Sequence, residues 1–156
     1  EYDNLVVVRT QSKGHALAGL RVGYALAQPD LIAALRCVRD PINSYTVDRA
    51  AQAAAAASLR DAAYFQERTA QVVRTRQRTA LALRDMGFAV TDSQANFLFV
   101  RHPQVPAKTL LDGLRERGIL VRWFDRPRIR DYLRITVGTD GEMDALTAAL
   151  KELTEV

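Results

Sequence analysis

The N-terminal third of the chain carries two apolar runs followed by two stretches with helical spacing. This pattern predicts, in chain order, a buried strand over residues 4–10, a strand over 20–27, a helix over 29–39 and an alanine-rich helix over 47–58. Proline suits the first turn of a helix, so the third element is expected to begin at Pro29, and Pro41 disfavours helix at the residue before it. Thr46 is the expected cap of the alanine-rich helix.

Beyond residue 60 the apolar positions switch repeatedly between the helical and the extended period. The pattern predicts a helix over 61–86, strands over 88–90 and 96–101, a helix over 106–117, strands over 119–123 and 132–137, and a last helix from 140 to about 153. Gly87 and Gly118 are expected to end the helices before them, and Asp140 is expected to cap the last one. Helices alternating with pairs of strands predict an α+β domain, a sheet covered by helices.

The composition indicates a folded chain without membrane spans, disulfides or metal. Apolar residues make up 48% of the 156 positions, and no apolar run approaches the roughly 20 residues that a membrane-spanning helix needs. The single cysteine, Cys37, cannot form an internal disulfide, which fits a protein of the reducing cytoplasm. Cys37 lies on the predicted helix 29–39, and we expect its side chain in the core. His15 and His102 are too few and too far apart to predict a metal site. The chain starts at Glu1, without an initiator methionine or a secretory signal, and a processed or partial product is therefore expected.

The net charge of +4 raises the hypothesis of a surface that binds nucleic acid. Several arginines of one predicted helix contribute to this charge: Arg68, Arg74, Arg76, Arg78 and Arg84. No aromatic residues alternate with them, as a stacking surface for bases would require. A solvent-exposed helix face is the favoured interpretation, and we predict no nucleic-acid partner. A non-catalytic basic binding module stays open as an alternative of a different class.

Lys13 stands just past the first predicted strand, and Arg21 follows eight positions later. An amine that forms a Schiff base is nucleophilic only when neutral, and desolvation or nearby positive charge favours that form. Arg21 could supply the charge, and its guanidinium also offers a fork of donors suited to phosphate. These residues indicate a reactive amine beside a bound phosphate, although a lysine in such a turn is ordinarily a surface residue.

Four segments, in a fixed order along the chain, carry a family resemblance. They are Ser12–Tyr24 (Ser-Lys-Gly-His-Ala-Leu-Ala-Gly-Leu-Arg-Val-Gly-Tyr), Gln94–Phe97, Gly118–Arg122 and Tyr132–Thr139. They resemble the pyridoxal-phosphate (PLP) lysine motif and the later motifs of class I/II aminotransferases, most closely the histidinol-phosphate aminotransferases. The resemblance implies an α/β fold, the C-terminal part of a fold-type I PLP-dependent transferase. Residues 1–58 would end the PLP-binding large domain and include the interdomain helix, and residues 59–156 would form the small α+β domain.

The resemblance also implies how the cofactor is held. Lys13 matches the catalytic lysine that binds PLP covalently and moves the substrate proton, and Ser12 and Arg21 match residues that bind the cofactor phosphate. His15 departs from the aromatic or small residue expected at that point. It could face the cofactor edge, but a satisfied loop histidine is the favoured interpretation.

For the substrate, the resemblance singles out three residues of the C-terminal part. Arg134 matches the arginine that takes the anionic end of the substrate, and Arg122 matches a second such arginine. The two lie on predicted strands either side of one loop and could therefore converge. Asn96 either positions the substrate or only satisfies a turn, and the same two alternatives hold for Asn43 and Tyr45.

The reaction implied is transamination in histidine biosynthesis. Histidinol phosphate and 2-oxoglutarate would give imidazole-acetol phosphate and glutamate, in a homodimer that has no nucleic-acid or membrane partner. A threonine-phosphate decarboxylase and an aromatic amino-acid aminotransferase are alternatives with the same fold. Family members are longer, and their N-terminal part carries the aspartate that pairs with the pyridine nitrogen. We therefore expect this chain alone to be inactive.

Overall fold

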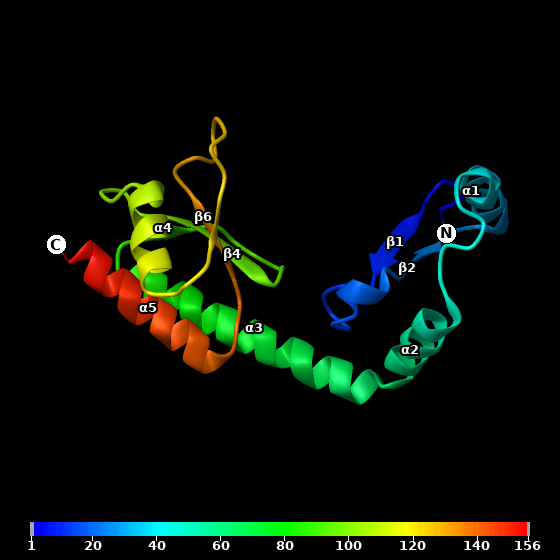
Figure 1. Ribbon diagram of the computed structural model, residues 1–156, viewed down its shortest axis with the longest axis horizontal. Helices are drawn as coiled ribbons and strands as arrows, with labels where there is room; N and C mark the ends of the chain where they lie inside the picture. Colours follow the sequence, from blue (N-terminus) through cyan, green and yellow to red (C-terminus); the bar gives the residue numbers. More distant parts are fainter. Residues whose placement is uncertain (1, 156) are drawn as a thin grey trace. The chain divides into compact units, whose positions relative to one another are not determined.

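The computed structural model describes residues 2–155 and divides into two compact units, Glu1–Glu67 and Arg68–Val156 (Figure 1). The long helix α3 (Ala62–Asp85) contributes residues to both. The predicted domain boundary at residue 58 stays a prediction.

The N-terminal unit holds a two-stranded ribbon and two helices. Its elements are β1 (Val7–Thr10), the short 3-10 helix η1 (Ala18–Leu20), β2 (Gly23–Leu26), α1 (Pro29–Ile42) and α2 (Arg49–Arg60). The strands pair antiparallel, with Val7 opposite Leu26 and Thr10 opposite Gly23. Both strands are shorter than predicted, because the backbone between them folds into a loop that includes η1.

The expectation of a buried first strand is wrong. All residues of β1 are exposed, Val8 with 74% of its surface, because no second layer among the described residues of this unit covers the ribbon. Cys37 is exposed too, and not in the core as expected. The helix that carries it, α1, buries none of its residues, so Leu35 and Val38 also face outward.

Two helix ends in this unit also differ from the sequence-based expectation. Helix α1 continues through Pro41 to Ile42, so the proline lies in the last turn of the helix and does not end it at the residue before. Asp48 caps α2 instead of Thr46: its carboxylate accepts a hydrogen bond from Ala51 N at 2.7 Å. A carboxylate at this position is favoured both as a cap and by the helix dipole.

The C-terminal unit follows the predicted order of elements. After α3 come β3 (Ala89–Val90), β4 (Phe97–Arg101), α4 (Ala107–Glu116), β5 (Arg122–Trp123), β6 (Leu133–Thr136) and α5 (Asp140–Thr154). The strands form one antiparallel sheet in the order β3-β4-β6-β5. β5 is the most shortened, since Ile119 N donates to Leu114 O (2.9 Å) and closes α4 instead of extending the strand. The predicted α+β pattern is confirmed for this unit.

One face of this sheet packs on the helices and forms the core. Leu98 and Val100 of β4 and Leu133 and Ile135 of β6 are at most 2% exposed. The three helices add apolar side chains to the same cluster: Ala80, Leu83, Leu110, Leu114, Met143, Leu146 and Leu150. Met143, Leu146 and Leu150 thus form the apolar stripe by which α5 packs on the core. Figure 1 shows α3 and α5 running beside each other, with α4 next to them.

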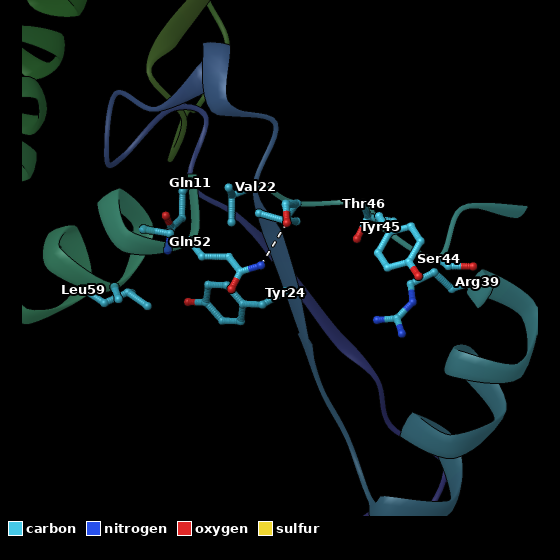
Figure 2. Close-up of a pocket in the computed structure, with 12 residues that line it drawn as sticks. Gln11, Val22, Tyr24, Arg39, Ser44, Tyr45, Thr46, Gln52 and Leu59 are labelled. Carbon is cyan, nitrogen blue, oxygen red and sulfur yellow. Dashed lines mark hydrogen bonds between the residues drawn. The ribbon is translucent and has the colours of Figure 1, made fainter. Parts of the chain in front are cut away.

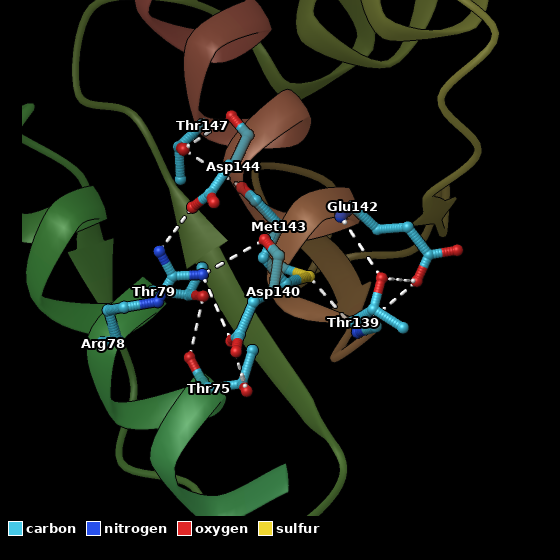
Figure 3. Close-up of polar contacts among 10 residues, drawn as sticks. Thr75, Arg78, Thr79, Thr139, Asp140, Glu142, Met143, Asp144 and Thr147 are labelled. Atoms are coloured by element: carbon cyan, nitrogen blue, oxygen red, sulfur yellow. Dashed lines mark hydrogen bonds and ion pairs between the residues drawn. The ribbon is translucent and has the colours of Figure 1, made fainter. Parts of the chain in front are cut away.

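Thr139, and not Asp140, caps α5. Thr139 N donates to the Glu142 carboxylate (2.7 Å) while Glu142 N donates to the Thr139 hydroxyl (3.4 Å), a reciprocal capping box. The hydrogen bonds from the Thr139 backbone and hydroxyl lower the pKa of Glu142. Asp140 takes the first helical position instead, where it accepts a hydrogen bond from Thr75 Oγ1 at 2.7 Å (Figure 3).

Arg78 joins α3 to the start of α5 (Figure 3). Its guanidinium donates to Asp144 through Nη1 and to Asp140 Oδ1 through Nη2 (3.3 Å). The hydrogen bond and charge of Asp144, with the charge of Asp140, raise the pKa of Arg78. The interpretation of the helical arginines as a solvent-exposed face is wrong for Arg76, which is 6% exposed.

Among the described residues, no helix combines the length and apolar character needed to cross a membrane, and no group of three or more histidine, cysteine or acidic side chains is placed to hold a metal ion.

Candidate active site

Residues 11–22 form the loop between β1 and β2 that carries the predicted lysine. Gln11 N donates to Val22 O (3.1 Å), which closes the loop at its base, and Leu17 N donates back to Gln11 O (3.1 Å). A tight turn over Lys13 is closed by a bond from the backbone N–H three residues later to Lys13 O (2.9 Å). The lysine is thus displayed on an ordered loop.

Two residues of this loop, Ala16 and Arg21, hold left-handed backbone angles, with φ of 54° and 56°. Residues other than glycine avoid this region, so surrounding contacts must hold the loop in shape. The two strands approach each other closely at Gly23, where a Cβ would lie 2.9 Å from Arg9 O. At Gly19, by contrast, a Cβ would have nothing within 4 Å.

Lys13 is the lysine whose amine no carboxylate engages. The chain has three lysines. Lys108 pairs with Asp112 (2.5 Å) and Lys151 pairs with Glu155 (3.6 Å), each across one helical turn. Lys13 is exposed and has no ion pair within residues 2–155. Among the three lysines, its Nζ is therefore the one that no carboxylate of the described residues engages.

Ser12 and Arg21 add hydrogen-bond donors on the same loop. Thr10 Oγ1 donates to Ser12 Oγ (2.8 Å), which leaves the Ser12 hydroxyl hydrogen for another acceptor. Arg21 is exposed, and its Nη1 donates a hydrogen bond to Ala18 O (3.1 Å). No carboxylate in the described part of the chain pairs with it. The loop that carries Lys13 thus also carries donors and positive charge that no carboxylate of the described residues neutralises.

His15 is satisfied within the N-terminal unit. Its ring stacks on Phe65 with centroids 4.5 Å apart, and its Nδ1 shares a hydrogen bond with Ser58 Oγ (2.7 Å). Gly14 lies against the same Phe65 ring, where a Cβ would come within 2.7 Å. The interpretation of His15 as a satisfied loop histidine is confirmed.

A pocket of about 530 Å³ lies within the N-terminal unit beside the base of the loop (Figure 2). Gln11 and Tyr24 line it from the ribbon, Gln52 from α2, and Tyr45 from the segment between the helices. Gln11 is 1% exposed, and its Oε1 has no hydrogen-bond partner among the described residues. The pocket therefore holds a buried acceptor that this unit by itself leaves unsatisfied.

Asn43 and Tyr45 show the turn chemistry considered from the sequence. Asn43 Oδ1 accepts a hydrogen bond from Tyr45 N (3.3 Å), a local turn of the kind that asparagine favours. Tyr45 is 95% exposed. A site role for either residue stays a prediction.

In the C-terminal unit, the pairing of β5 with β6 places Arg122 directly opposite Arg134. Neither guanidinium has an ion pair among residues 2–155, and Arg134 Nε is buried without an acceptor. Their neighbours are aromatic. Arg134 Cζ lies 5.5 Å from the Phe97 ring centroid and 5.7 Å from that of Phe124, and Arg122 Cζ lies 5.5 Å from the Phe124 centroid. Two unneutralised guanidiniums with an unused buried donor suit an anion.

Asn96 lies in a turn that other residues hold in place. Val137 N donates to Asn96 O (2.9 Å), and Arg76 Nη1 donates to Ala95 O (2.8 Å). The Ser93 hydroxyl closes the turn from the other side, donating to a β4 carbonyl at 2.6 Å. The Asn96 side chain makes no hydrogen bond with the described residues, so the turn forms without it.

Sequence reasoning missed the roles of Arg76 and Phe124. Arg76 shares a helical face with the buried Thr79, Ala80 and Leu83, at spacings of three, four and seven residues. That spacing is a signal that could have set it apart from the exposed arginines. Phe124 gives no such signal, because it follows a strand of only two residues.

Three comparisons place this geometry among known proteins. The protein family described as "Aminotransferase class I and II" matches residues 1–150 of the chain. A histidinol-phosphate aminotransferase of Acinetobacter baylyi is 54% identical over 151 residues, which are 97% of this chain and 42% of that protein. The structure of the Sinorhizobium meliloti histidinol-phosphate aminotransferase in complex with pyridoxal-5'-phosphate matches with a TM-score of 0.85 at 34% identity, covering 98% of this chain and 42% of that one. An L-threonine-O-3-phosphate decarboxylase from Porphyromonas gingivalis matches with a TM-score of 0.81 at 27% identity, covering 99% of this chain and 48% of that one.

The fold is that of the fold-type I PLP-dependent transferases, as the sequence predicts. The chain belongs to the class I and II aminotransferase family, whose members depend on PLP. Its relatives at about half identity are histidinol-phosphate aminotransferases, which confirms the resemblance of the motifs. The chain spans about two fifths of the length of these curated relatives, 42% in the case of the Acinetobacter baylyi protein.

The loop of β1 and β2 carries groups of the kinds that the aldehyde and the phosphate of PLP need. The cofactor carries an aldehyde, which needs an amine not tied up by an acid, and a phosphate, which needs donors free of competing carboxylates. Lys13 meets the first need, and Ser12 and Arg21 meet the second. The residues present fit the group.

Proposed function

We propose that this chain supplies the cofactor-binding lysine and the substrate-binding arginines of a PLP-dependent histidinol-phosphate aminotransferase. The observation that carries the proposal is the amine of Lys13, which alone among three lysines has no carboxylate partner in the described chain. It stands on one loop with the donors Ser12 and Arg21. The names of the relatives support the choice of substrate.

Lys13 would hold the cofactor through Nζ and, once displaced, would move a proton to and from the substrate carbon that bears the amino group. The Ser12 hydroxyl and the Arg21 guanidinium would bind the cofactor phosphate. PLP, when bound, supplies a carbonyl that takes up the amino group and a ring that accepts electrons.

Arg122 and Arg134 would bind the anionic ends of the substrates in turn. Histidinol phosphate has no α-carboxylate, so its phosphate is the anion to be held, whereas glutamate and 2-oxoglutarate present carboxylates. Guanidinium forks suit both groups. Asn96, whose amide no described residue engages, would contact the substrate from its turn. The overall exchange would convert histidinol phosphate and 2-oxoglutarate into imidazole-acetol phosphate and glutamate.

Covalent trapping tests the role of Lys13. The parent-length protein and this chain are each mixed with PLP, reduced with borohydride and digested, and the modified lysine is located by mass spectrometry. We expect the label on Lys13, its loss in Lys13→Ala, and its retention in the matched control Lys151→Ala. Label spread evenly over the three lysines would refute the assignment.

Product analysis tests the substrate. The parent-length protein is given PLP, histidinol phosphate and 2-oxoglutarate, and glutamate formation is measured. The likeness to a threonine-phosphate decarboxylase makes decarboxylation the specific rival. Release of carbon dioxide from threonine phosphate, without glutamate formation, would favour that rival. Absence of both products together with absence of Lys13 labelling would favour a non-catalytic basic binding module.

A further inference from the structure

One aromatic ring lies against both arginines of the proposed anion site. The Phe124 centroid is 5.5 Å from Arg122 Cζ and 5.7 Å from Arg134 Cζ. Phe97 contacts only the second of these, at 5.5 Å from Arg134 Cζ. Phe124 is therefore the ring that the two guanidiniums share.

The shared ring offsets the repulsion between two arginines that the strand pairing brings together. Arg122 and Arg134 lie directly opposite each other on β5 and β6, and like charges in that position repel. A carboxylate between them would relieve the repulsion, but none pairs with either residue in the part of the chain that the structure describes. The negative face of an aromatic ring attracts cations instead. Phe124 can thus hold both charges without neutralising them.

An aromatic neighbour also leaves the donors of a guanidinium unused. A carboxylate would occupy N–H groups in bidentate hydrogen bonds, whereas a ring contact occupies none. Arg134 Nε, buried without an acceptor, is such an unused donor. The full donor set of both arginines is therefore kept for the ligand.

We propose that Phe124 is a positioning residue that sets specificity, holding Arg122 and Arg134 together so that both reach one phosphate group. The proposal rests on the proposed function of this site and names its selectivity. A phosphate monoester presents three terminal oxygens and a double charge, which two guanidiniums can share. A carboxylate presents two oxygens, which a single guanidinium fork satisfies. Loss of Phe124 should therefore weaken phosphate binding more than carboxylate binding.

The test compares Phe124→Leu with Phe124→Tyr, which keeps the ring, in the parent-length protein loaded with PLP. Phe88→Leu is the matched control, because the Phe88 ring lies edge-on to His102 with centroids 4.9 Å apart and is a cross-strand partner of neither arginine. KM and kcat are measured for histidinol phosphate and for glutamate. Binding of inorganic phosphate is measured by calorimetry on the same proteins, and tryptophan fluorescence verifies that each is folded.

We expect Phe124→Leu to raise KM for histidinol phosphate roughly five- to twentyfold, with less than a threefold change for glutamate and little change in kcat. Inorganic phosphate binding should weaken in parallel, and Phe124→Tyr should restore both. Equal effects on the two substrates, failure of Phe124→Tyr to restore binding, or the same losses in Phe88→Leu would overturn the proposal. If the wild-type protein does not turn over histidinol phosphate, the proposed function fails. Phosphate binding by wild type and Phe124→Leu then still decides the role of the ring.

Discussion

Replacing Arg76 by methionine should destabilise the turn that carries Asn96. Arg76 is buried on α3, and its hydrogen bond within the described residues goes to Ala95 O at 2.8 Å. Methionine keeps most of the aliphatic stem, so the packing against the core changes little. The donor and the charge disappear, and the Ala95 carbonyl loses its partner.

Two opposing effects set the size of the loss. A hydrogen bond from a charged donor contributes about 1.5–3 kcal/mol, and a buried carbonyl left without a partner costs a similar amount. Removing a buried charge that has no ion pair offsets part of this cost. We therefore expect the free energy of unfolding of the C-terminal unit to fall by about 1–2 kcal/mol. For a unit of this size, each kcal/mol lowers Tm by roughly 4–8 °C.

Tryptophan fluorescence during urea unfolding measures this loss. Trp123 is the single tryptophan of the chain and packs against the core of the C-terminal unit, so it reports the unfolding of that unit. Arg74→Met is the matched control: Arg74 is exposed two residues earlier on the same helix, and its change should stay within about 0.5 kcal/mol. If Arg76→Met unfolds at the same urea concentration as wild type, the turn does not depend on the guanidinium and the reasoning is wrong.

Other variants probe the helix cap, the loop strain and the core. Hydrogen bonds from Thr139 depress the folded-state pKa of Glu142, so its contribution to stability is present above the unfolded pKa of about 4.3 and is lost as pH falls through the folded pKa. The urea midpoints of Glu142→Gln and wild type should therefore differ at pH 7 and converge in acid. Ala16→Gly should raise stability by up to about 1 kcal/mol in thermal melts, because glycine tolerates the left-handed angle. Arg21→Gly should relieve the same strain yet weaken PLP binding in a spectroscopic titration. Leu133→Ala, at a fully buried position, should cost about 2–5 kcal/mol by the same fluorescence assay.

The sequence predicts the C-terminal unit well because its signals are local. Gly87 and Gly118 adopt positive φ angles of 85° and 73° where α3 and α4 end, as their positions indicate. Burial in the N-terminal unit could not be predicted in the same way. An apolar run such as β1 indicates a buried strand, but burial depends on a covering layer, which the described residues of this unit do not provide.

In the candidate site, too, local sequence signals were predictive and tertiary contacts were not predictable. A motif of consecutive residues singles out Lys13, and strands that flank one loop predict that Arg122 and Arg134 meet. What surrounds these groups is a matter of tertiary contacts. The contact of Phe124 with both arginines depends on how side chains of different elements are placed, and no local spacing in the sequence indicates it. The burial of Arg76 also depends on contacts between elements.

The two halves of the proposed site lie on strands whose backbone amide protons should exchange at different rates. β4 and β6 are hydrogen-bonded on both sides, whereas β1 and β2 have one partner each among the described strands. Amide protons of the strand that carries Arg134 should therefore exchange with deuterium only when the C-terminal unit opens as a whole, while those beside the Lys13 loop exchange by local fraying. The group proposed to hold the substrate anion is fixed on a slow, protected strand. The group proposed to move the proton stands on the loop between two strands whose amide protons exchange fast.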